Sequence, residues 1–345
     1  MRIYSHRRGQ FASVFVLTIG LLTIVCPSGA LAHVKWFSTF NVASGPRPLA
    51  LVLSSSFGLL FLVSLVAFWG ACLIERTAIG AALIDTLDRL TAELRPRTEV
   101  LLRACGSGFF VALFVLGNVI LTPELKTALP FIPWLQLGIA IGLFWRRTMI
   151  LSGCGIVALY AIGVANYGPF HLMDYPIFLG LAAYYILSGL GIERTVLGLR
   201  PVDVARWGAG ITLMWASVEK WAYPQWTYPL LIQHPDLTIG WEPSLYMTAA
   251  GVIEFGLAFG LIWTPMVRRL SATVLMVMFI SAVFEFGKVD AIGHSMIIAI
   301  LIAVAVDKSP SPQWRPAPAP IAYALALAAT LAAYYGFHTI LYGAA

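Results

Sequence analysis

Long apolar runs separated by short polar segments dominate the chain. A transmembrane helix needs about 20 mainly apolar residues, and runs of that order recur throughout the sequence. We predict eleven hydrophobic segments, the later ones interrupted by single charges: 9–34, 48–74, 104–123, 127–145, 148–173, 175–192, 207–220, 243–267, 270–284, 291–306 and 316–345. The pattern predicts an all-α polytopic membrane protein.

The first segment has the organisation of a signal peptide. Three arginines lie within the first eight residues, an apolar stretch follows, and Ala30-Leu31-Ala32 has the small-residue pattern of a cleavage site. We predict that residues 1–32 are removed, which leaves about ten mature transmembrane helices. An uncleaved signal anchor is the alternative.

Composition narrows the class of protein further. Of 345 residues, 59% are hydrophobic and 11% are charged, against about 45–50% and about 25% in soluble domains. So little charge cannot cover a water-soluble particle of this length. A soluble enzyme, a disordered chain and a nucleic-acid binder are therefore excluded, and the partner implied is the lipid bilayer.

The basic residues fall on alternate sides of the predicted spans. With the mature N-terminus outside, fourteen Lys and Arg residues fall on cytoplasmic segments and five on outer ones, namely Lys35, Arg47, Lys126, Lys220 and Lys288. This is the positive-inside pattern, and it accounts for the net charge of +6. It predicts a multi-pass protein of a bacterial-type inner membrane with both mature termini outside.

Two stretches resemble each other about 118 residues apart, which indicates an internal repeat. Leu135–Trp145 and Ile253–Trp263 share Gly, Ala, Gly and Trp positions, and Gln136 corresponds to Glu254. Convergent small residues on packing faces can mimic a repeat, but the matches favour duplication. We predict four-helix units at 100–192 and 203–306. Residues 33–99 hold an outer segment, one span and a cytoplasmic amphipathic segment, and 307–345 hold a linker and the last span.

The second unit carries a recognisable arrangement of small and charged residues. Arg206-Trp207-Gly208-Ala209-Gly210 begins a predicted helix that ends at Glu219-Lys220, and Gly251-Val252-Ile253-Glu254 lies in the next helix, followed by Gly256, Gly260, Arg269 and His294. In this pattern the unit resembles the DoxX family of four-helix membrane proteins. The first unit resembles it more weakly, since Gln136 replaces the glutamate and Lys220 has no counterpart. The resemblance implies a membrane subunit of a redox system, quinone-linked in some relatives and tied to thiol or oxidative-stress chemistry in others.

Glu254 is the ionisable residue that the pattern places deepest in the bilayer. An ionisable group there costs at least about 2.5 kcal/mol and is a functional-site hypothesis. It is a candidate for proton relay to a quinone or another substrate, or for a structural pair with Lys220. We predict catalytic roles for Glu254, Lys220, Glu285 and His294, in the second unit or between the units.

Histidines gather on the predicted outer side, where His33, His171 and His234 are candidate metal ligands. Cleavage after Ala32 would place a free amine beside the imidazole of His33, a pair able to chelate copper. Solvated loop residues are the alternative, because no HxxxH or CxxC spacing supports a metal site.

Aromatic residues crowd the longest outer loop and the helix before it. An interfacial belt explains most of them, but Trp215, Trp221 and Trp241 are also candidates to roof a quinone pocket. The redox subunit with its partner subunits is thus the first functional prediction. An exoplasmic copper-handling protein and a small-solute transporter with its path past Glu254 are the alternatives.

Overall fold

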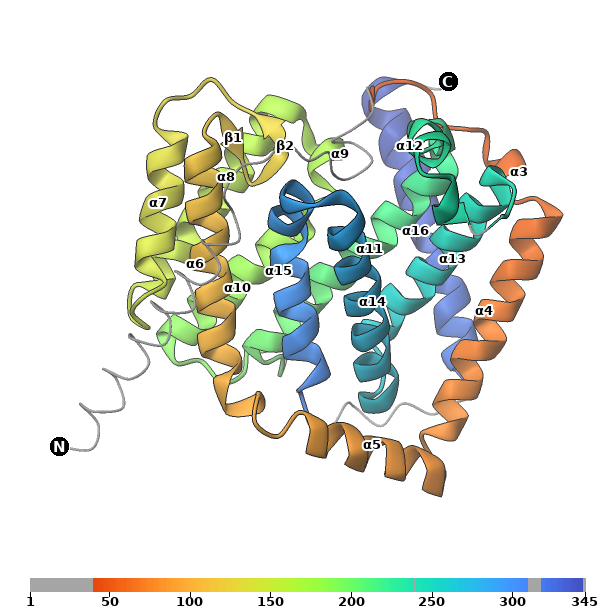
Figure 1. Ribbon diagram of the computed structural model, residues 1–345, viewed down its shortest axis with the longest axis horizontal. Coiled ribbons are helices and arrows are strands. Elements are labelled where there is room, and N and C mark those ends of the chain that lie inside the picture. Colours follow the sequence, from red (N-terminus) through yellow and green to blue (C-terminus); the bar gives the residue numbers. More distant parts are fainter. Residues whose placement is uncertain (1–39, 239, 310–317, 344–345) are drawn as a thin grey trace.

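The computed structural model of the chain describes residues 40–238, 240–309 and 318–343 (Figure 1). The predicted signal peptide and His33 lie outside the described residues. The helices are α3 (Leu49–Val52), α4 (Ser55–Ile74), α5 (Ala78–Leu90), α6 (Thr98–Leu116), α7 (Ile132–Gly142), α8 (Met149–Tyr167), α9 (Pro169–Leu172), α10 (Pro176–Leu190), α11 (Pro201–Ala222), α12 (Tyr228–Gln233), α13 (Pro243–Leu261), α14 (Pro265–Phe286), α15 (Lys288–Ala305) and α16 (Ala319–Tyr342). Short 3₁₀ turns occur at Arg95–Arg97, Pro224–Trp226 and Pro235–Thr238, and the strands are β1 (Val119–Ile120) and β2 (Thr122–Lys126).

Seven of the described helices are long and apolar enough to cross a membrane: α4, α6, α8, α13, α14, α15 and α16. α7 and α10 are apolar but shorter, with 11 and 15 residues. α11 has 22 residues but carries charges near both ends. Many large apolar side chains on α4 and α14 are exposed, as contact with lipid requires. The prediction of a helical, polytopic membrane protein is confirmed.

The helix predicted over 104–123 ends early. α6 stops at Leu116, because Gly117 adopts a φ of 60°, and the chain then forms the antiparallel hairpin of β1 and β2. The span predicted over 104–123 is therefore wrong from Gly117 onward. Leu121 and Leu125 of the hairpin are fully buried, and an apolar run that short cannot be assigned to helix or strand by periodicity alone.

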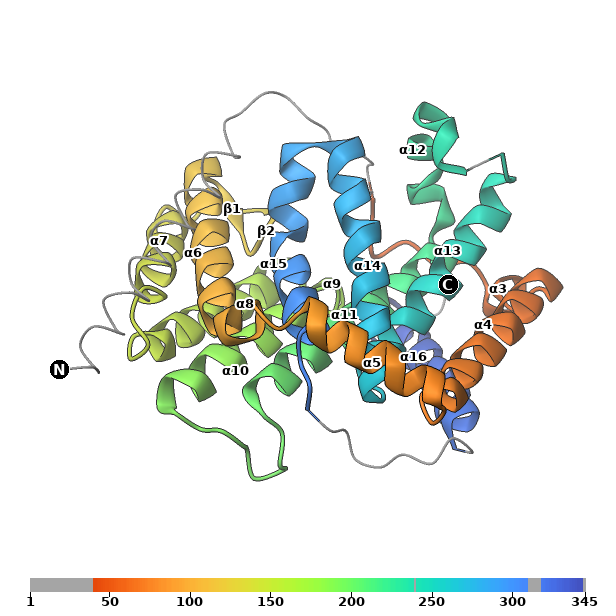
Figure 2. The ribbon, with the colours of Figure 1, turned by 60° about the horizontal axis from the view of Figure 1, so that its bottom comes forward.

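The helices of the two predicted units pack in the same order. α6, α7, α8 and α10 contact one another successively, as do α11, α13, α14 and α15. In addition, α10 packs on α11 and α15 packs on α6, so the last helix of each set meets the first helix of the other (Figures 1 and 2). A Cβ atom on Gly208 of α11 would lie 3.0 Å from the Cα atom of Gly180 in α10, so this close approach requires glycine. α4 and α16 flank the second set and contact each other and α13.

The two sets also share side-chain contacts. Gly142, at the end of α7, lies against the Ser152 hydroxyl of α8, and Gly260, at the end of α13, lies against the Ser271 hydroxyl of α14. A Cβ atom on either glycine would overlap the facing serine oxygen. Both contacts fall at corresponding positions of the predicted repeat.

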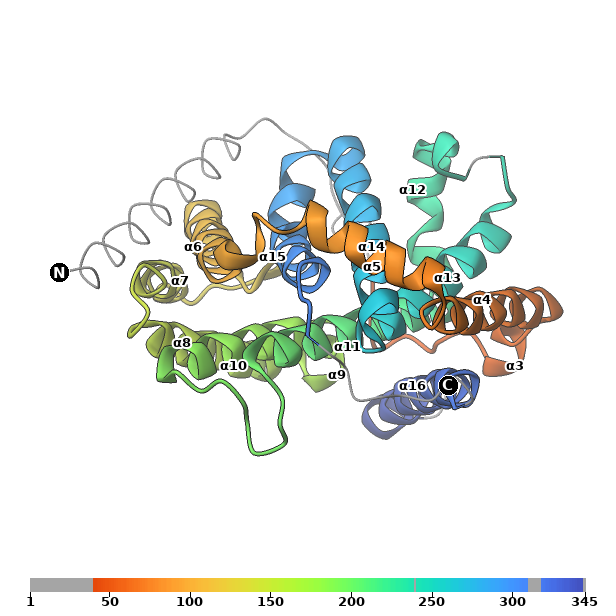
Figure 3. The ribbon, with the colours of Figure 1, turned by 90° about the horizontal axis from the view of Figure 1, so that it is seen from below.

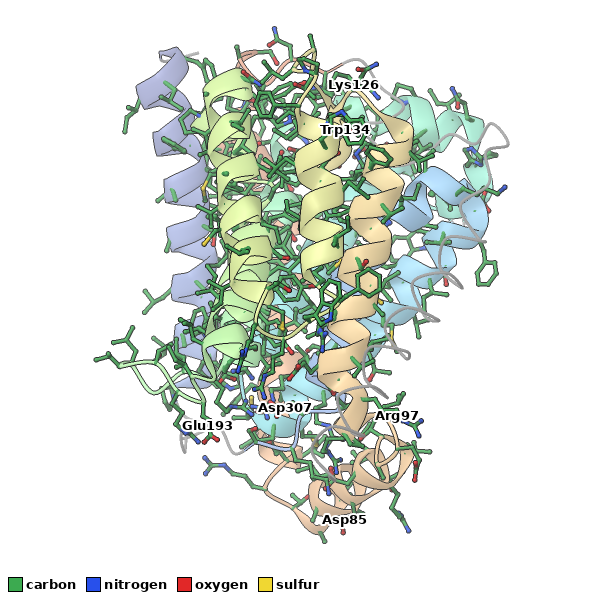
Figure 4. All side chains as sticks on the ribbon, turned by 90° about the vertical axis from the view of Figure 1, so that its left-hand side faces the viewer. Asp85, Arg97, Lys126, Trp134, Glu193 and Asp307 are labelled. Atoms are coloured by element: carbon green, nitrogen blue, oxygen red, sulfur yellow. The ribbon has the colours of Figure 1, made fainter. Side chains whose placement is uncertain are left out.

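α5 lies across one end of the helices, beneath α14 (Figure 3). Asp88 of α5 forms ion pairs of 2.8 Å with Arg269 and 2.7 Å with Lys308, which tie α5 to the helical body. Figure 4 shows labelled residues at both ends: Asp85, Arg97, Glu193 and Asp307 at the end with α5, and Lys126 and Trp134 at the opposite end. Segments predicted to lie on opposite sides of the membrane therefore lie at opposite ends of the molecule.

Candidate functional site

A cavity of about 330 Å³ lies between the two sets of helices. Its wall is formed by β2 and the start of α10, by α11, α13, α14 and α15, and by the loop that contains α12. Three of the four predicted catalytic residues, Lys220, Glu254 and His294, line it. The volume falls in the range of about 300–1,000 Å³ that is usual for small-molecule sites. Residues singled out on three separate helices thus meet around one space.

Lys220 and Glu254 form an ion pair between α11 and α13. The Lys220 Nζ atom lies 2.8 Å from a Glu254 carboxylate oxygen, and the two side chains are 28% and 11% exposed. The helices approach closely because Gly251 leaves room for the indole of Trp221, whose N–H donates to the Thr248 carbonyl oxygen at 3.2 Å. The lysine offsets part of the cost of holding a carboxylate inside an apolar bundle.

The first unit contains a neutral version of this contact. Gln136 in α7 corresponds to Glu254 in α13, and its Nε2 atom donates to the Val119 carbonyl oxygen at 2.9 Å. Val119 follows the end of α6, much as Lys220 lies near the end of α11. A backbone carbonyl therefore takes the place of the lysine as the partner, and only the second unit has charge at this position.

His294 pairs with Asp290, one turn earlier on α15. The Nδ1 atom of His294 lies 2.8 Å from Asp290 Oδ2, and its ring packs on Phe279 with centroids 4.7 Å apart. The carboxylate favours a proton on Nδ1, which leaves Nε2 as the acceptor of the neutral ring. Asp290 is 1% exposed, and its Oδ1 atom has no hydrogen-bond partner among the described residues. Both residues line the cavity, so a ligand there meets a histidine–carboxylate pair.

A third polar group on the wall comes from the first unit. Glu124 of β2 accepts a hydrogen bond of 2.5 Å from the Tyr175 hydroxyl and lies 2.7 Å from His171 Nε2. Glu124 and Tyr175 line the cavity, together with Asp174 and Glu219. Sequence reasoning missed Glu124 as a site residue because the hairpin that brings it back to α10 was expected to be the end of a span. The one available signal was the Pro123-Glu124 pair at the edge of a long uncharged run.

The remaining candidates lie elsewhere. Glu285, the fourth predicted catalytic residue, pairs with His234 at 2.8 Å, and both side chains are well exposed. Neither residue lines the cavity.

The three tryptophans proposed as a roof do not come together over the cavity. Trp215 packs against Phe170 and Tyr334, Trp221 packs against Phe57 and Phe255, and Trp241 is exposed. The tryptophan on the wall is instead Trp226, which stacks on Tyr223 with centroids 4.1 Å apart. Packing partners on other helices decide which aromatic residue faces the space, and spacing along one loop cannot reveal them.

Metal ligation has little support in the described part of the chain. His171 and His234 each pair with a different carboxylate, Glu124 and Glu285. No group of three His, Cys, Asp or Glu side chains within residues 40–238, 240–309 and 318–343 is arranged to hold a metal ion. The copper chelate predicted at His33 falls outside these residues and stays a prediction.

The resemblance to the DoxX family rests on the residues of the second unit. Those residues include Lys220, Glu254 and His294, which share the cavity wall. Comparison with protein-family models, with curated proteins and with solved structures gave no match.

Proposed function

We propose that the chain is a DoxX-like integral membrane protein that acts as the membrane subunit of a redox system, with a quinone as the ligand of the cavity. One observation carries this proposal. The cavity wall combines an apolar lining with two close pairs of ionisable side chains, Lys220–Glu254 and Asp290–His294. The resemblance of the second unit to the DoxX family agrees with it, because three of these four residues belong to the quoted pattern.

The residues on the wall suit a quinone head group. Phe178, Leu275 and Phe279 offer apolar surface for a flat ring. Lys220 carries N–H groups that can donate a hydrogen bond to a ring carbonyl oxygen, and Nε2 of neutral His294 can accept one from the hydroxyl group of a reduced quinone. A bound quinone would supply reversible transfer of electrons together with protons, and the electrons would be exchanged with a redox partner subunit.

The chain's own contribution would be proton exchange at defined atoms. Nε2 of His294 can take up a proton while Asp290 stabilises the resulting imidazolium, since their side chains are 2.8 Å apart. Glu254 can hold a second proton, and Lys220 stabilises its ionised form. Positioned carboxylates and imidazoles typically accelerate proton transfer by about 10²–10⁴-fold.

We further propose that ten helices cross the membrane, namely the seven long apolar helices with α7, α10 and α11. The membrane is a bacterial-type inner membrane, with both mature termini outside. The alternation of basic residues supports this orientation, as does the separation of Arg97 from Lys126 at opposite ends of the molecule (Figure 4).

Quinone binding by the purified protein tests the proposal. The protein in mild detergent is titrated with a tail-less benzoquinone, and binding is followed by quenching of tryptophan fluorescence. We expect saturable binding that weakens by about tenfold in Asp290→Asn. Glu193→Gln is the control, because Glu193 is exposed near the end opposite Lys126. Absence of saturable binding to the wild-type protein would overturn the proposal.

Transport of a cationic solute is the second candidate. The cavity wall carries five carboxylates, Glu124, Asp174, Glu219, Glu254 and Asp290, against the basic residues Lys220 and His294. Such an acidic excess favours a cation. Flux of a cationic solute into liposomes that depends on the protein and is lost in Glu254→Ala would support this candidate over the quinone site.

A further inference from the structure

The half of α14 that lies away from α5 packs on α15 through Phe279 and His294 but is only partly buried. The buried residues of α14 are all in its first half, ending at Leu275, and no residue of the fully described stretch Met276–Phe286 is buried. α13 and α14 are held together near Gly260 and Ser271 and diverge from there (Figures 1 and 2). The two helices therefore form a V that is closed at the end with α5 and open at the other.

The cavity extends along this half of α14. α14 contributes Leu275, Met278, Phe279, Ala282 and Phe286 to the wall. Met278 lines the cavity and is 39% exposed, and its neighbour Val277 is exposed without lining the cavity. The side chains along this edge are apolar, and α14 is one of the seven helices suited to cross a membrane. An apolar opening beside a helix that crosses the membrane faces the lipid.

The corresponding part of the first unit is closed. Counting from the shared Gly–Ser contacts, α8 has Leu159 where α14 has Met278, and Gly163 where α14 has Ala282. Leu159 is 0% exposed. Leu172 of α9 and Leu121 of the hairpin lie against Gly163. In the second unit α15 follows directly after Gly287, with no helix equivalent to α9. The opening is therefore a specific feature of the second unit and not a consequence of the four-helix arrangement.

We propose that the gap between the outer halves of α13 and α14 is a lateral portal, through which a quinone with a long isoprenoid tail enters the cavity from the outer leaflet. The inference rests on the proposed quinone site and adds the class of ligand and its route. The head group lies near Glu254, Lys220 and His294, while the tail passes along Met278 and Ala282 into the lipid. The exposed His234–Glu285 pair connects the α12 loop to the end of α14 and bounds the portal on the water side.

Bulky substitutions on the cavity-facing side of α14 test the portal. Met278→Trp and Ala282→Trp narrow the proposed route. Val277→Trp is the matched control, because Val277 is exposed on the same helix and does not line the cavity. Each variant is reconstituted in nanodiscs and titrated with two probes, a benzoquinone with a long isoprenoid tail and the same head group without a tail.

We expect the long-tailed probe to bind about tenfold more weakly to Met278→Trp and Ala282→Trp than to the wild type or Val277→Trp. The tail-less probe should lose less affinity than the long-tailed probe in these two variants, and its saturable binding also shows that the variants are folded. Equal binding of the long-tailed probe to all four proteins would refute the portal, as would equal weakening of both probes. If neither probe binds the wild type, the proposed quinone site itself is wrong.

Discussion

Replacement of Lys220 by alanine is expected to destabilise the protein through the charge that it leaves behind. The Glu254 carboxylate is 11% exposed and lies 2.8 Å from the lysine ammonium group. Removing one partner of a buried ion pair lowers the free energy of unfolding by about 3–5 kcal/mol, because the other charge stays buried without a partner. Lys220 is 28% exposed, so some water reaches the pair. We therefore expect the lower end of that range, about 3 kcal/mol.

Two further variants separate charge from packing. Glu254→Gln introduces the residue that the first unit has at Gln136, and a neutral amide requires no cation. The double variant Lys220→Met with Glu254→Gln should therefore recover most of the loss and remain within about 1 kcal/mol of the wild type. Lys126→Ala is the control, because Lys126 is an exposed lysine at one end of the molecule, and it should change stability by less than about 0.5 kcal/mol.

The free energy of unfolding can be measured in mixed micelles by titration with a denaturing detergent, followed by tryptophan fluorescence. If the double variant is as unstable as Lys220→Ala, the lysine stabilises through its alkyl chain, and the electrostatic reasoning is wrong.

A second measurement, quinone-dependent turnover, tests whether the pair has a role in function. If the double variant is stable but loses quinone-dependent turnover, the pair takes part in the reaction, whereas full turnover would make it structural.

Two other predictions concern packing and pH. Gly260→Ala should lower the free energy of unfolding by about 1–3 kcal/mol, because the added methyl group overlaps the Ser271 hydroxyl. Adding Ser271→Ala should restore most of the lost melting temperature. A double variant as unstable as the single one would contradict this. Burial alone would raise the pKa values of Asp88 and Asp307, but hydrogen bonds from neighbouring cationic and serine side chains outweigh it and lower both. Carboxylates with lowered folded-state pKa values contribute stability above the unfolded value, about 3.9, and lose it as the pH falls through the folded one. Asp307→Asn should therefore reduce the acid-induced loss of stability, measured by denaturant titration across this window, and an unchanged loss would contradict the assignment.

Much of the fold could be predicted because the bilayer imposes simple rules. A span must be apolar over about 20 residues, so hydropathy located the long helices, and the positions of the basic residues predicted which segments share an end of the molecule. The same rule failed at 117–126. Leu121 and Leu125 are apolar because they are buried against protein, and hydropathy does not distinguish burial in protein from contact with lipid.

The candidate site was predictable where burial cost singled out a residue. A carboxylate in the middle of an apolar segment costs free energy when it enters the membrane, and this cost singled out Glu254 from the sequence alone. Glu124 gave no such signal, since a charge at the edge of a span costs little. The tryptophans gave no such signal either, because aromatic residues are frequent at membrane interfaces and their type does not reveal which of them faces a cavity.

The two units differ both in the charge at the position of Glu254 and in how open the region along their third helix is. The first unit has Gln136 at the position of Glu254, and Leu121 and Leu172 close the region that is open in the second unit. The second unit has the ion pair, the opening along α14 and the larger part of the cavity wall. A buried ion pair is often no more stable than apolar residues of the same size, and Gln136 shows that this bundle can accept a neutral side chain there. The second unit has both the charge at this position and the opening along α14, and the first unit has neither. Packing alone would allow either feature without the other, whereas the ligand site proposed above requires both.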